Sequence, residues 1–164
     1  MSADQVRMEI KGLMLDPTSN VPIVILKDAE SSLFLPIWIG VFEANAIALK
    51  IEGVEMPRPM THDLFRTSIE QLGGRLEKIL ISDLKDNTFF AQLHLRQDDR
   101  QLTVDSRPSD AIALAVRTEA PIFVLREVLD RAKAADLTAT ETDEEKLKKW
   151  LEEVSPEDLG KYKM

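Results

Sequence analysis

The stretch DAIALAVRT, residues 110–118, decides the fold class of this chain. Its alanines and leucine favour a helix, and its apolar side chains cover nearly the whole circumference. A helix that is apolar all round is buried, either in a core or in a subunit interface. The preceding residues 101–105 alternate as a β-strand does, with Leu102 and Val104 directed inward. The sequence therefore predicts a strand that leads into a buried helix.

The four residues AIAL occur a second time, at 46–49, within the stretch FEANAIALKIEG of residues 42–53. This stretch also predicts a buried helix, ended by Gly53, and it also follows an apolar β segment. Each copy has an acidic residue near its helix start, Glu43 in the first and Asp110 in the second. The repeat predicts an internal duplication of a strand-plus-buried-helix unit, in which these two residues occupy equivalent places.

Period-two alternation and short apolar runs predict the remaining elements. Together they predict an α+β domain, with a mixed or antiparallel sheet packed with helices. Trp38 falls in an apolar strand and is expected in the core. The predicted strands are 6–15, 21–27, 33–39, 76–82, 88–96, 101–105 and 122–124, and the predicted helices are 42–53, 62–72, 110–118 and 125–135.

We expect two parts along the chain. Residues 1–135 form the α+β domain, and residues 136–164 form a linker followed by an acidic C-terminal helical appendage. The linker covers residues 136–142, and Trp150 lies on the apolar stripe of the helix after it.

The charge balance restricts the partners. The chain has 21 Lys and Arg against 29 Asp and Glu, a net charge of −8, and half of this excess lies in residues 136–164. A mildly acidic body is a poor general binder of polyanions, because nonspecific affinity for nucleic acid comes mostly from basic groups. Any nucleic acid therefore has to be held by a local basic patch or through a bound cation.

Several classes of protein are excluded by composition and motif. There is no cysteine, which excludes disulfides, thiolate metal ligands and a cysteine nucleophile. No apolar run reaches the roughly 18 residues of a membrane helix, and the N-terminus does not read as a secretory signal, so we expect a cytoplasmic protein without membrane contact. The sequence also has no Walker loop, dinucleotide glycine fingerprint, nucleophile elbow or HExxH pair.

One polar cluster, RPMTHD at residues 58–63, precedes the second predicted helix. In a functional interpretation Asp63 ligates a divalent cation, His62 acts as a base or ligand, and Arg58 holds a phosphate. In a structural interpretation Thr61 caps the helix and Asp63 complements its dipole.

A second cluster, DSRPSD at residues 105–110, lies at a strand-to-helix junction. In a functional interpretation Asp105 and Asp110 share Mg²⁺ while Arg107 engages a phosphate. Alternatively, Ser109 caps the helix, Asp110 complements its dipole, and an ion pair between Asp105 and Arg107 locks the turn.

Three motifs, taken together and in their order along the chain, resemble the bifunctional nuclease (BFN) domain family. They are LPIWIGVFEANAIAL at 35–49, PRPMTHDLF at 57–65 and DSRPSDAIALAVRTEAPIFV at 105–124, and the resemblance spans roughly residues 6–130. It implies an α+β domain that tends to form homodimers. It also implies nuclease activity on both DNA and RNA.

The resemblance directs attention to the polar positions of the three motifs. For these residues the chemistry favours Mg²⁺ or Mn²⁺ held by Asp63, Asp105 and Asp110, with His62 helping proton transfer. The full set of expected catalytic residues is His62, Asp63, Asp105, Asp110 and Glu43, and the expected substrate-binding residues are Arg58, Arg107 and Ser109.

Two hypotheses about function follow. The first is a metal-dependent nuclease, which requires Asp63, Asp105 and Asp110 to converge within a few Å of one point, with Glu43 as a further candidate. The second is a non-enzymatic homodimeric module that binds a protein or a small ligand, which the apolar helices and the acidic charge also fit. Carboxylates that point apart, or that are held in caps and salt bridges, favour the second hypothesis.

Overall fold

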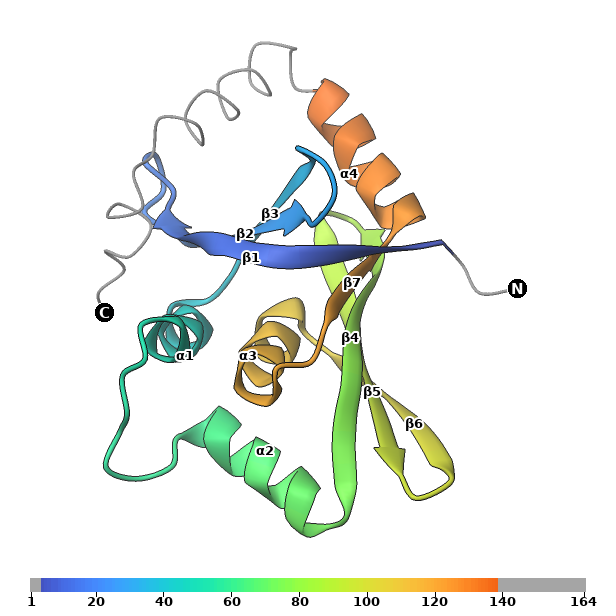
Figure 1. Ribbon diagram of the computed structural model, residues 1–164. Coiled ribbons are helices and arrows are strands. Elements are labelled where there is room, and N and C mark those ends of the chain that lie inside the picture. Colours follow the sequence, from blue (N-terminus) through green and yellow to red (C-terminus); the bar gives the residue numbers. More distant parts are fainter. Residues whose placement is uncertain (1–3, 139–164) are drawn as a thin grey trace.

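The computed structural model describes residues 4–138, which form a seven-stranded sheet and four helices (Figure 1). This confirms the predicted α+β class. The elements are β1 (Gln5–Leu15), β2 (Pro22–Asp28), β3 (Phe34–Trp38), α1 (Val41–Ile51), α2 (Thr61–Gln71), β4 (Gly74–Lys85), β5 (Thr88–Gln97), β6 (Arg100–Ser106), α3 (Pro108–Thr118), β7 (Ile122–Leu125) and α4 (Arg126–Thr138).

The strands lie in the order β3-β2-β1-β7-β4-β5-β6. Every neighbouring pair is antiparallel except β4 and β7, which are parallel, so the sheet is mixed but mostly antiparallel. The short strand β7 joins the two halves, because Val124 pairs with Val6 on one side and with Ile81 on the other. In Figure 1 the strands β1–β3 run at a steep angle to β4–β6, and α3 lies in the corner between them.

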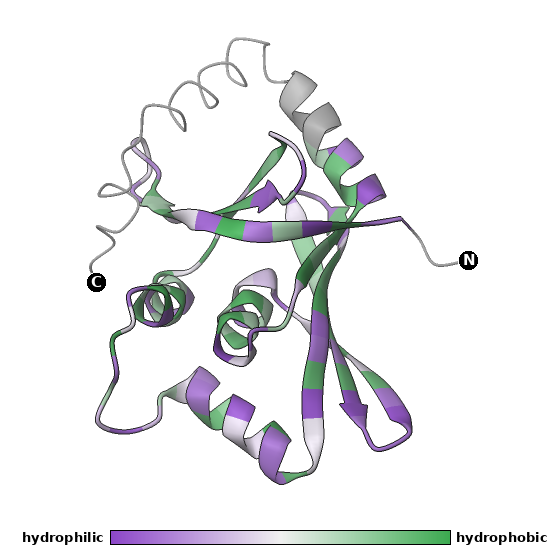
Figure 2. Ribbon diagram, viewed as in Figure 1, coloured by the Kyte–Doolittle hydropathy of each residue, from purple (hydrophilic) through white to green (hydrophobic). Residues whose placement is uncertain are grey.

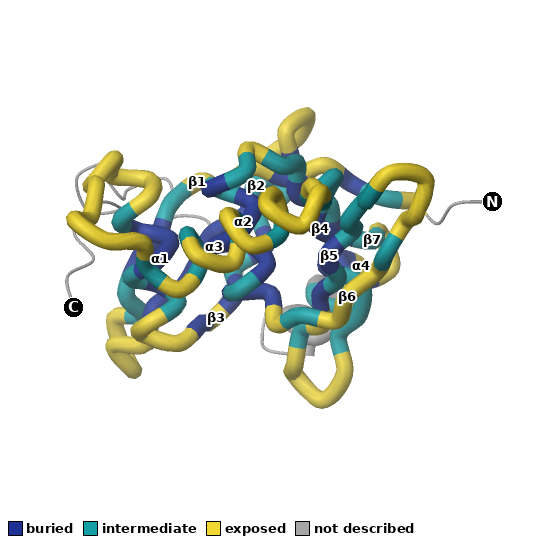
Figure 3. Tube along the Cα trace, turned by 90° about the horizontal axis from the view of Figure 1, so that it is seen from below, coloured by how far each residue is buried: buried dark blue, intermediate teal, exposed yellow. Residues whose placement is uncertain are grey.

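The core is built around α3, which contacts α1, α2, β4 and β5. Its residues Ala111, Ile112 and Leu114 are fully buried, as the sequence predicts. Figure 2 shows α1 and α3 as largely hydrophobic, while α2 carries many hydrophilic residues. No residue of α2 is buried, and it lies on the outside of the molecule in Figure 3.

The prediction of complete burial is wrong for part of α1. Ala44 and Ile47 are fully buried, but Phe42 is 79% exposed. The placement of Trp38 in the core is also wrong, since its side chain is 49% exposed. Trp38 lies on β3, an edge strand, and its indole Nε1 donates a hydrogen bond to Asp16 Oδ2 at 2.8 Å. The prediction that Val104 is directed inward is also wrong, since Val104 lies on the opposite edge strand, β6, and is 40% exposed.

The helix starts differ from the expected caps by one or two positions. Met60, not Thr61, precedes the first turn of α2. Arg107, not Ser109, is the cap residue of α3, and it makes no side-chain cap bond. α1 ends at the cap residue Glu52, one residue before Gly53. Gly53 has a φ of +69°, a left-handed conformation that glycine adopts without strain.

The two AIAL helices have similar surroundings. Each follows a three-stranded antiparallel meander, β1–β3 for α1 and β4–β6 for α3. An origin by duplication stays a prediction, because an arrangement of elements does not test common ancestry.

The predicted domain boundary lies inside a helix. α4 extends to Thr138, so residues 136–138 of the expected linker are helical. The rest of the expected appendage, with Trp150, lies outside the described residues. No helix within residues 4–138 is long and apolar enough to span a membrane.

Candidate functional site

Four of the polar residues singled out in the sequence meet in one cluster. Arg107 Nη2 lies 2.6 Å from Glu43 Oε1 and 2.8 Å from Asp110 Oδ2. Arg107 Nε also donates to Asp110 Oδ2 at 2.9 Å. The other oxygen of Asp110, Oδ1, lies 3.0 Å from His62 Nε2. The result is a continuous chain of polar contacts through Glu43, Arg107, Asp110 and His62.

The cluster forms where two helices start. Glu43 is the third residue of α1 and Asp110 is the third residue of α3. Gly40 and Arg107, the cap residues of the two helices, line the same pocket, so both N-termini lie at the same end of the fold. Helix N-termini carry positive partial charge, which the two first-turn carboxylates offset. The hydrogen bonds to Glu43 and then to Asp110 raise the pKa of Arg107, which keeps it cationic.

The side chain of Glu43 folds back over Gly40. A Cβ atom at Gly40 would overlap the carboxylate oxygen Oε2 of Glu43. The side chain of Glu43 is only 17% exposed, while that of Arg107 is 65% exposed. Glu43 is therefore largely shielded from solvent, and the guanidinium faces outward.

His62 is held by Asp110 at the start of α2. Its side chain is 13% exposed, and its Nε2 contacts Asp110. Nδ1 of the ring has no hydrogen-bond partner within residues 4–138. A histidine fixed through one nitrogen by a carboxylate is the arrangement used for general acid–base chemistry through the other nitrogen.

Asp63, next to His62, belongs to a different ion pair. Its Oδ1 accepts from Arg117 Nε at 2.8 Å, and its Oδ2 accepts from the backbone N–H of Met60 at 2.9 Å. Burial disfavours the ionised carboxyl, but the hydrogen bonds from Met60 and Arg117 outweigh it, so the pKa of Asp63 lies below its ordinary value. Asp63 thus caps α2 and neutralises Arg117.

The sequence analysis missed Arg117, which joins three helices. Its side chain is 4% exposed and, besides Asp63, it donates to the carbonyl oxygens of Ala113 and Ala46 at 2.8 and 2.9 Å. A signal was present, because a single cation on an otherwise apolar helix needs a buried partner. Asp63, which the sequence analysis places at a metal site or at the helix dipole, is that partner.

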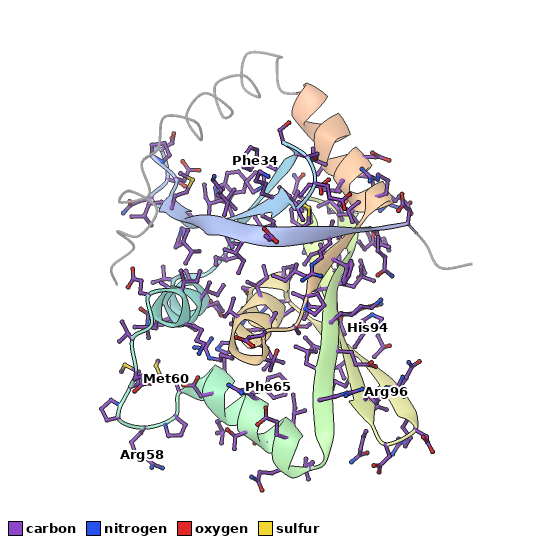
Figure 4. The ribbon with its side chains drawn as sticks, viewed as in Figure 1. Phe34, Arg58, Met60, Phe65, His94 and Arg96 are labelled. Atoms are coloured by element: carbon purple, nitrogen blue, oxygen red, sulfur yellow. The ribbon has the colours of Figure 1, made fainter. Side chains whose placement is uncertain are left out.

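Of the other predicted site residues, Asp105 and Arg58 lie apart from the cluster, and Ser109 lies beside it. Asp105 is exposed on β6 opposite Gln92, and the expected ion pair between Asp105 and Arg107 does not form. Arg58 is exposed on the loop between α1 and α2 and points away from the helices (Figure 4). Ser109 is buried and lines the pocket next to Arg107.

The three carboxylates expected to share a metal ion do not fit that role. Asp63 is bound to Arg117, Asp110 is bound to Arg107 and His62, and Asp105 is exposed elsewhere. Within residues 4–138, no three His, Asp or Glu side chains are grouped in a way that could hold a metal ion.

A separate groove lies away from this cluster, on the β4–β6 half of the sheet. It has a volume of about 410 Å³ and is lined by Glu77, Lys78, His94 and Phe123 among others. Burial and then the charge of Lys78 lower the pKa of His94, which Figure 4 shows on β5 near Arg96. Lys78 already donates to Gln5 and lies 5.5 Å from the ring centroid of Phe123, while Glu77 pairs with Arg96.

Residues 24–136 match the model of the bifunctional nuclease domain. The chain belongs to the bifunctional nuclease domain family. A Mycobacterium tuberculosis protein named only as uncharacterized is 42% identical over 161 residues, which is 93% of this chain and 96% of the relative. Bifunctional nuclease 1 of Oryza sativa is 24% identical over 69% of this chain, and bifunctional nuclease 1 of Arabidopsis thaliana is 27% identical over 63%.

The similarity to the plant members is limited to one part of those proteins. The matched region covers 35% of the rice protein and 33% of the Arabidopsis protein. Family membership therefore extends over most of this chain, whereas the name nuclease comes from more distant and longer members.

Proposed function

We propose that this chain is a nuclease that hydrolyses phosphodiester bonds of DNA and RNA at the cluster of Glu43, Arg107, Asp110 and His62. The observation that carries the proposal is the unbroken set of contacts from an exposed arginine, through one aspartate, to a histidine with a free ring nitrogen. The names of the plant family members support the same activity.

Arg107 binds the phosphate in this proposal. Its side chain is 65% exposed, and its Nη1 has no partner within residues 4–138. A guanidinium pairs well with phosphate oxygens, and it offsets the charge that develops on them during hydrolysis. Glu43 positions the guanidinium from the buried side.

His62 moves the proton in this proposal. Nδ1 accepts a proton from the attacking water, while Asp110 holds Nε2 and stabilises the imidazolium that forms. As the water oxygen bonds to phosphorus, the P–O bond to the leaving oxygen breaks, and that oxygen takes a proton from solvent. The proposal assigns no step to Mg²⁺ or Mn²⁺, because Asp63, Asp105 and Asp110 do not fit a shared metal site.

The test is cleavage of end-labelled single-stranded DNA and RNA by the purified chain, with Mg²⁺, with Mn²⁺ and with EDTA. We expect cleavage in all three conditions and a loss of about 100-fold or more in His62→Gln. The matched control, Asp105→Asn, removes a carboxylate that lies outside the cluster and should cleave like the unmodified protein. Equal cleavage by His62→Gln would contradict the proposal, because the cleavage would not depend on the cluster.

A second candidate function is the non-enzymatic homodimeric module, and one observation favours it. Exposed apolar side chains concentrate in α1 and in the loop that follows it, where Phe42 is 79%, Ile51 50%, Val54 47% and Met56 47% exposed. Grouped apolar side chains on a surface mark an interaction site, and a second copy of the chain is the occupant we propose. Absence of cleavage in every condition, together with a stable dimer, would favour this function over the nuclease.

A further inference from the structure

The groove of about 410 Å³ on the β4–β6 half of the sheet is lined by a row of polar residues that crosses three strands. Lys78 on β4 lies opposite His94 on β5, which lies opposite Thr103 on β6. Their neighbours Ile79 and Leu93 are buried in the core. Because side chains alternate along a strand, the row lies on the side of the sheet that faces away from the core, which we call the outer face. In Figure 1, α2 and α3 lie on the other side of these strands.

Four cations gather on the outer face, although the chain has a net charge of −8. Arg75 and Arg96 lie opposite each other in the row next to that of Lys78. Arg7 lies opposite Phe123, which lines the groove, across β1 and β7. An acidic chain can hold nucleic acid only at a local basic patch or through a bound cation, and the outer face supplies such a patch.

Three of these cations are not neutralised by a carboxylate within residues 4–138. The guanidinium groups of Arg7 and Arg75 are exposed and make no ion pair or hydrogen bond there. Nζ of Lys78 donates to a neutral glutamine side chain at 2.9 Å. Of the four, Arg96 alone pairs with a carboxylate, at 3.2 Å. Asp105, in the row on the other side, offsets one charge, so the face keeps a positive excess that attracts polyanions.

The groove also carries groups that recognise nucleobases. Phe123 is half-buried in it, and Lys78 Nζ lies 5.5 Å from the centroid of its ring. Burial and then the charge of Lys78 lower the pKa of His94, so its ring is neutral at neutral pH, with one donor and one acceptor nitrogen. Gln101 and Thr103 add exposed donors and acceptors. A basic groove with an aromatic ring is the combination that binds single-stranded nucleic acid.

We propose that the outer face binds single-stranded DNA or RNA, with phosphates at Arg7, Arg75 and Lys78 and a base against the ring of Phe123. A single strand is the occupant because its bases are free to stack on a protein ring, whereas those of a duplex are stacked on one another. The choice of nucleic acid over another polyanion rests on the proposed nuclease function.

Strand β6 connects the outer face with the cluster of the proposed nuclease. Gln101 and Thr103 of this strand line the groove, and Arg107 directly follows it. At the rise of a β-strand, Thr103 and Arg107 are roughly 13 Å apart along the chain. A bound single strand that extends a short way past the groove therefore reaches Arg107.

The test is the fluorescence anisotropy of an end-labelled single-stranded RNA of about 12 nucleotides, a length within the site sizes of single-strand binding proteins. The full-length His62→Gln protein is used, so that the RNA stays intact during the titration. We expect saturable binding that weakens with salt. The double variant Arg7→Gln/Arg75→Gln should lower the slope of log binding constant against log salt concentration by about 1.4, since each phosphate contact of a single strand contributes about 0.7.

Matched variants assign the binding to the outer face. Lys11→Gln/Lys50→Gln removes the same charge from α1 and from the part of β1 that does not pair with β7, and should leave the slope unchanged. Phe123→Leu should weaken RNA binding at least about fivefold, as expected for the loss of one stacked base. Phe34→Leu, which changes another half-buried ring on the far edge strand β3 (Figure 4), should bind normally.

Four results would each overturn the proposal. They are no binding, equal slopes for the two double variants, an equal effect of Phe123→Leu and Phe34→Leu, and equal affinity for a DNA duplex of the same length. The last would show a general polyanion surface that does not use the bases.

Binding and cleavage can fail separately. RNA binding with the expected variant pattern, but without cleavage by the unmodified protein, supports the outer face and overturns the nuclease. Cleavage that depends on His62, but with equal RNA binding by the two double variants, supports the nuclease and overturns the outer face.

Discussion

Glu43 and Asp110 bind the same guanidinium nitrogen, since Arg107 Nη2 lies 2.6 Å from Glu43 Oε1 and 2.8 Å from Asp110 Oδ2. Both carboxylates are the third residue of a helix, and the two helices begin side by side at one pocket. One arginine therefore ties together the starts of α1 and α3. The position of the Arg107 guanidinium therefore depends on the positions of Glu43 and Asp110 in the first turns of α1 and α3.

Gly40→Ala should disturb the site through Glu43. The added Cβ overlaps Glu43 Oε2, so the carboxylate has to move away from Arg107. A displacement of about 1 Å in a catalytic group can cost up to 100-fold in rate, so we expect kcat/KM for labelled RNA to fall between about 10-fold and 100-fold. A double-mutant cycle checks the cause: in a Glu43→Ala background, Gly40→Ala should have little further effect. Additive losses would mean that Gly40 acts in another way.

Asp63→Ala should destabilise the fold, whereas Asp105→Ala should not. Removing Asp63 leaves the buried guanidinium of Arg117 without its counter-charge, and breaking such a pair costs about 3 kcal/mol. Asp105 is exposed on an edge strand, where substitutions stay within about 0.5 kcal/mol. Urea unfolding of both variants measures the difference. Similar losses in the two would contradict a specific role of Asp63 in the fold.

Stability should fall in acid partly through Asp63. Its pKa is lowered in the folded chain, so its contribution is complete above the unfolded value of about 3.9 and is lost as the pH falls through the lower folded value. We expect the free energy of unfolding to decrease less between pH 6 and pH 3 in Asp63→Asn than in the unmodified protein. Urea unfolding at the two pH values measures this, and parallel decreases would rule out the contribution.

Phe42→Glu should weaken the proposed homodimer. Phe42 is 79% exposed among other exposed apolar residues, and a carboxylate there would have to be desolvated on association. Leu72→Glu is the matched control, because Leu72 is 74% exposed but follows the far end of α2. Sedimentation velocity should show a larger monomer fraction for Phe42→Glu alone. A monomeric unmodified protein would contradict the dimer itself.

Much of the fold could be predicted because its signals are local. Alternation identified the strands, and the two AIAL helices were found from their apolar content. Glu43 and Asp110 each fall third in their helix, while their equivalence through duplication stays a prediction.

The pairing within the site could not be predicted, because it depends on how helices face one another. His62 and Asp63 are neighbours in the chain, but consecutive residues of a helix point about 100° apart. One therefore meets Asp110 and the other meets Arg117, which lie two turns apart on α3. Likewise, the exposure of Trp38 follows from the position of β3 at the sheet edge, which depends on strand order.

The contacts that build this site also determine when it can appear during synthesis. Glu43 and Arg107 are 64 positions apart, Asp63 and Arg117 are 54 apart, and His62 and Asp110 are 48 apart. Contacts between such distant positions close large loops and form slowly compared with local structure. A nascent chain that ends before Arg107 can form the first meander and α1, but it contains neither the shared arginine nor α3. The proposed nuclease activity should therefore arise only after β6 and α3 have left the ribosome, so an incomplete chain should not cleave the messenger that encodes it.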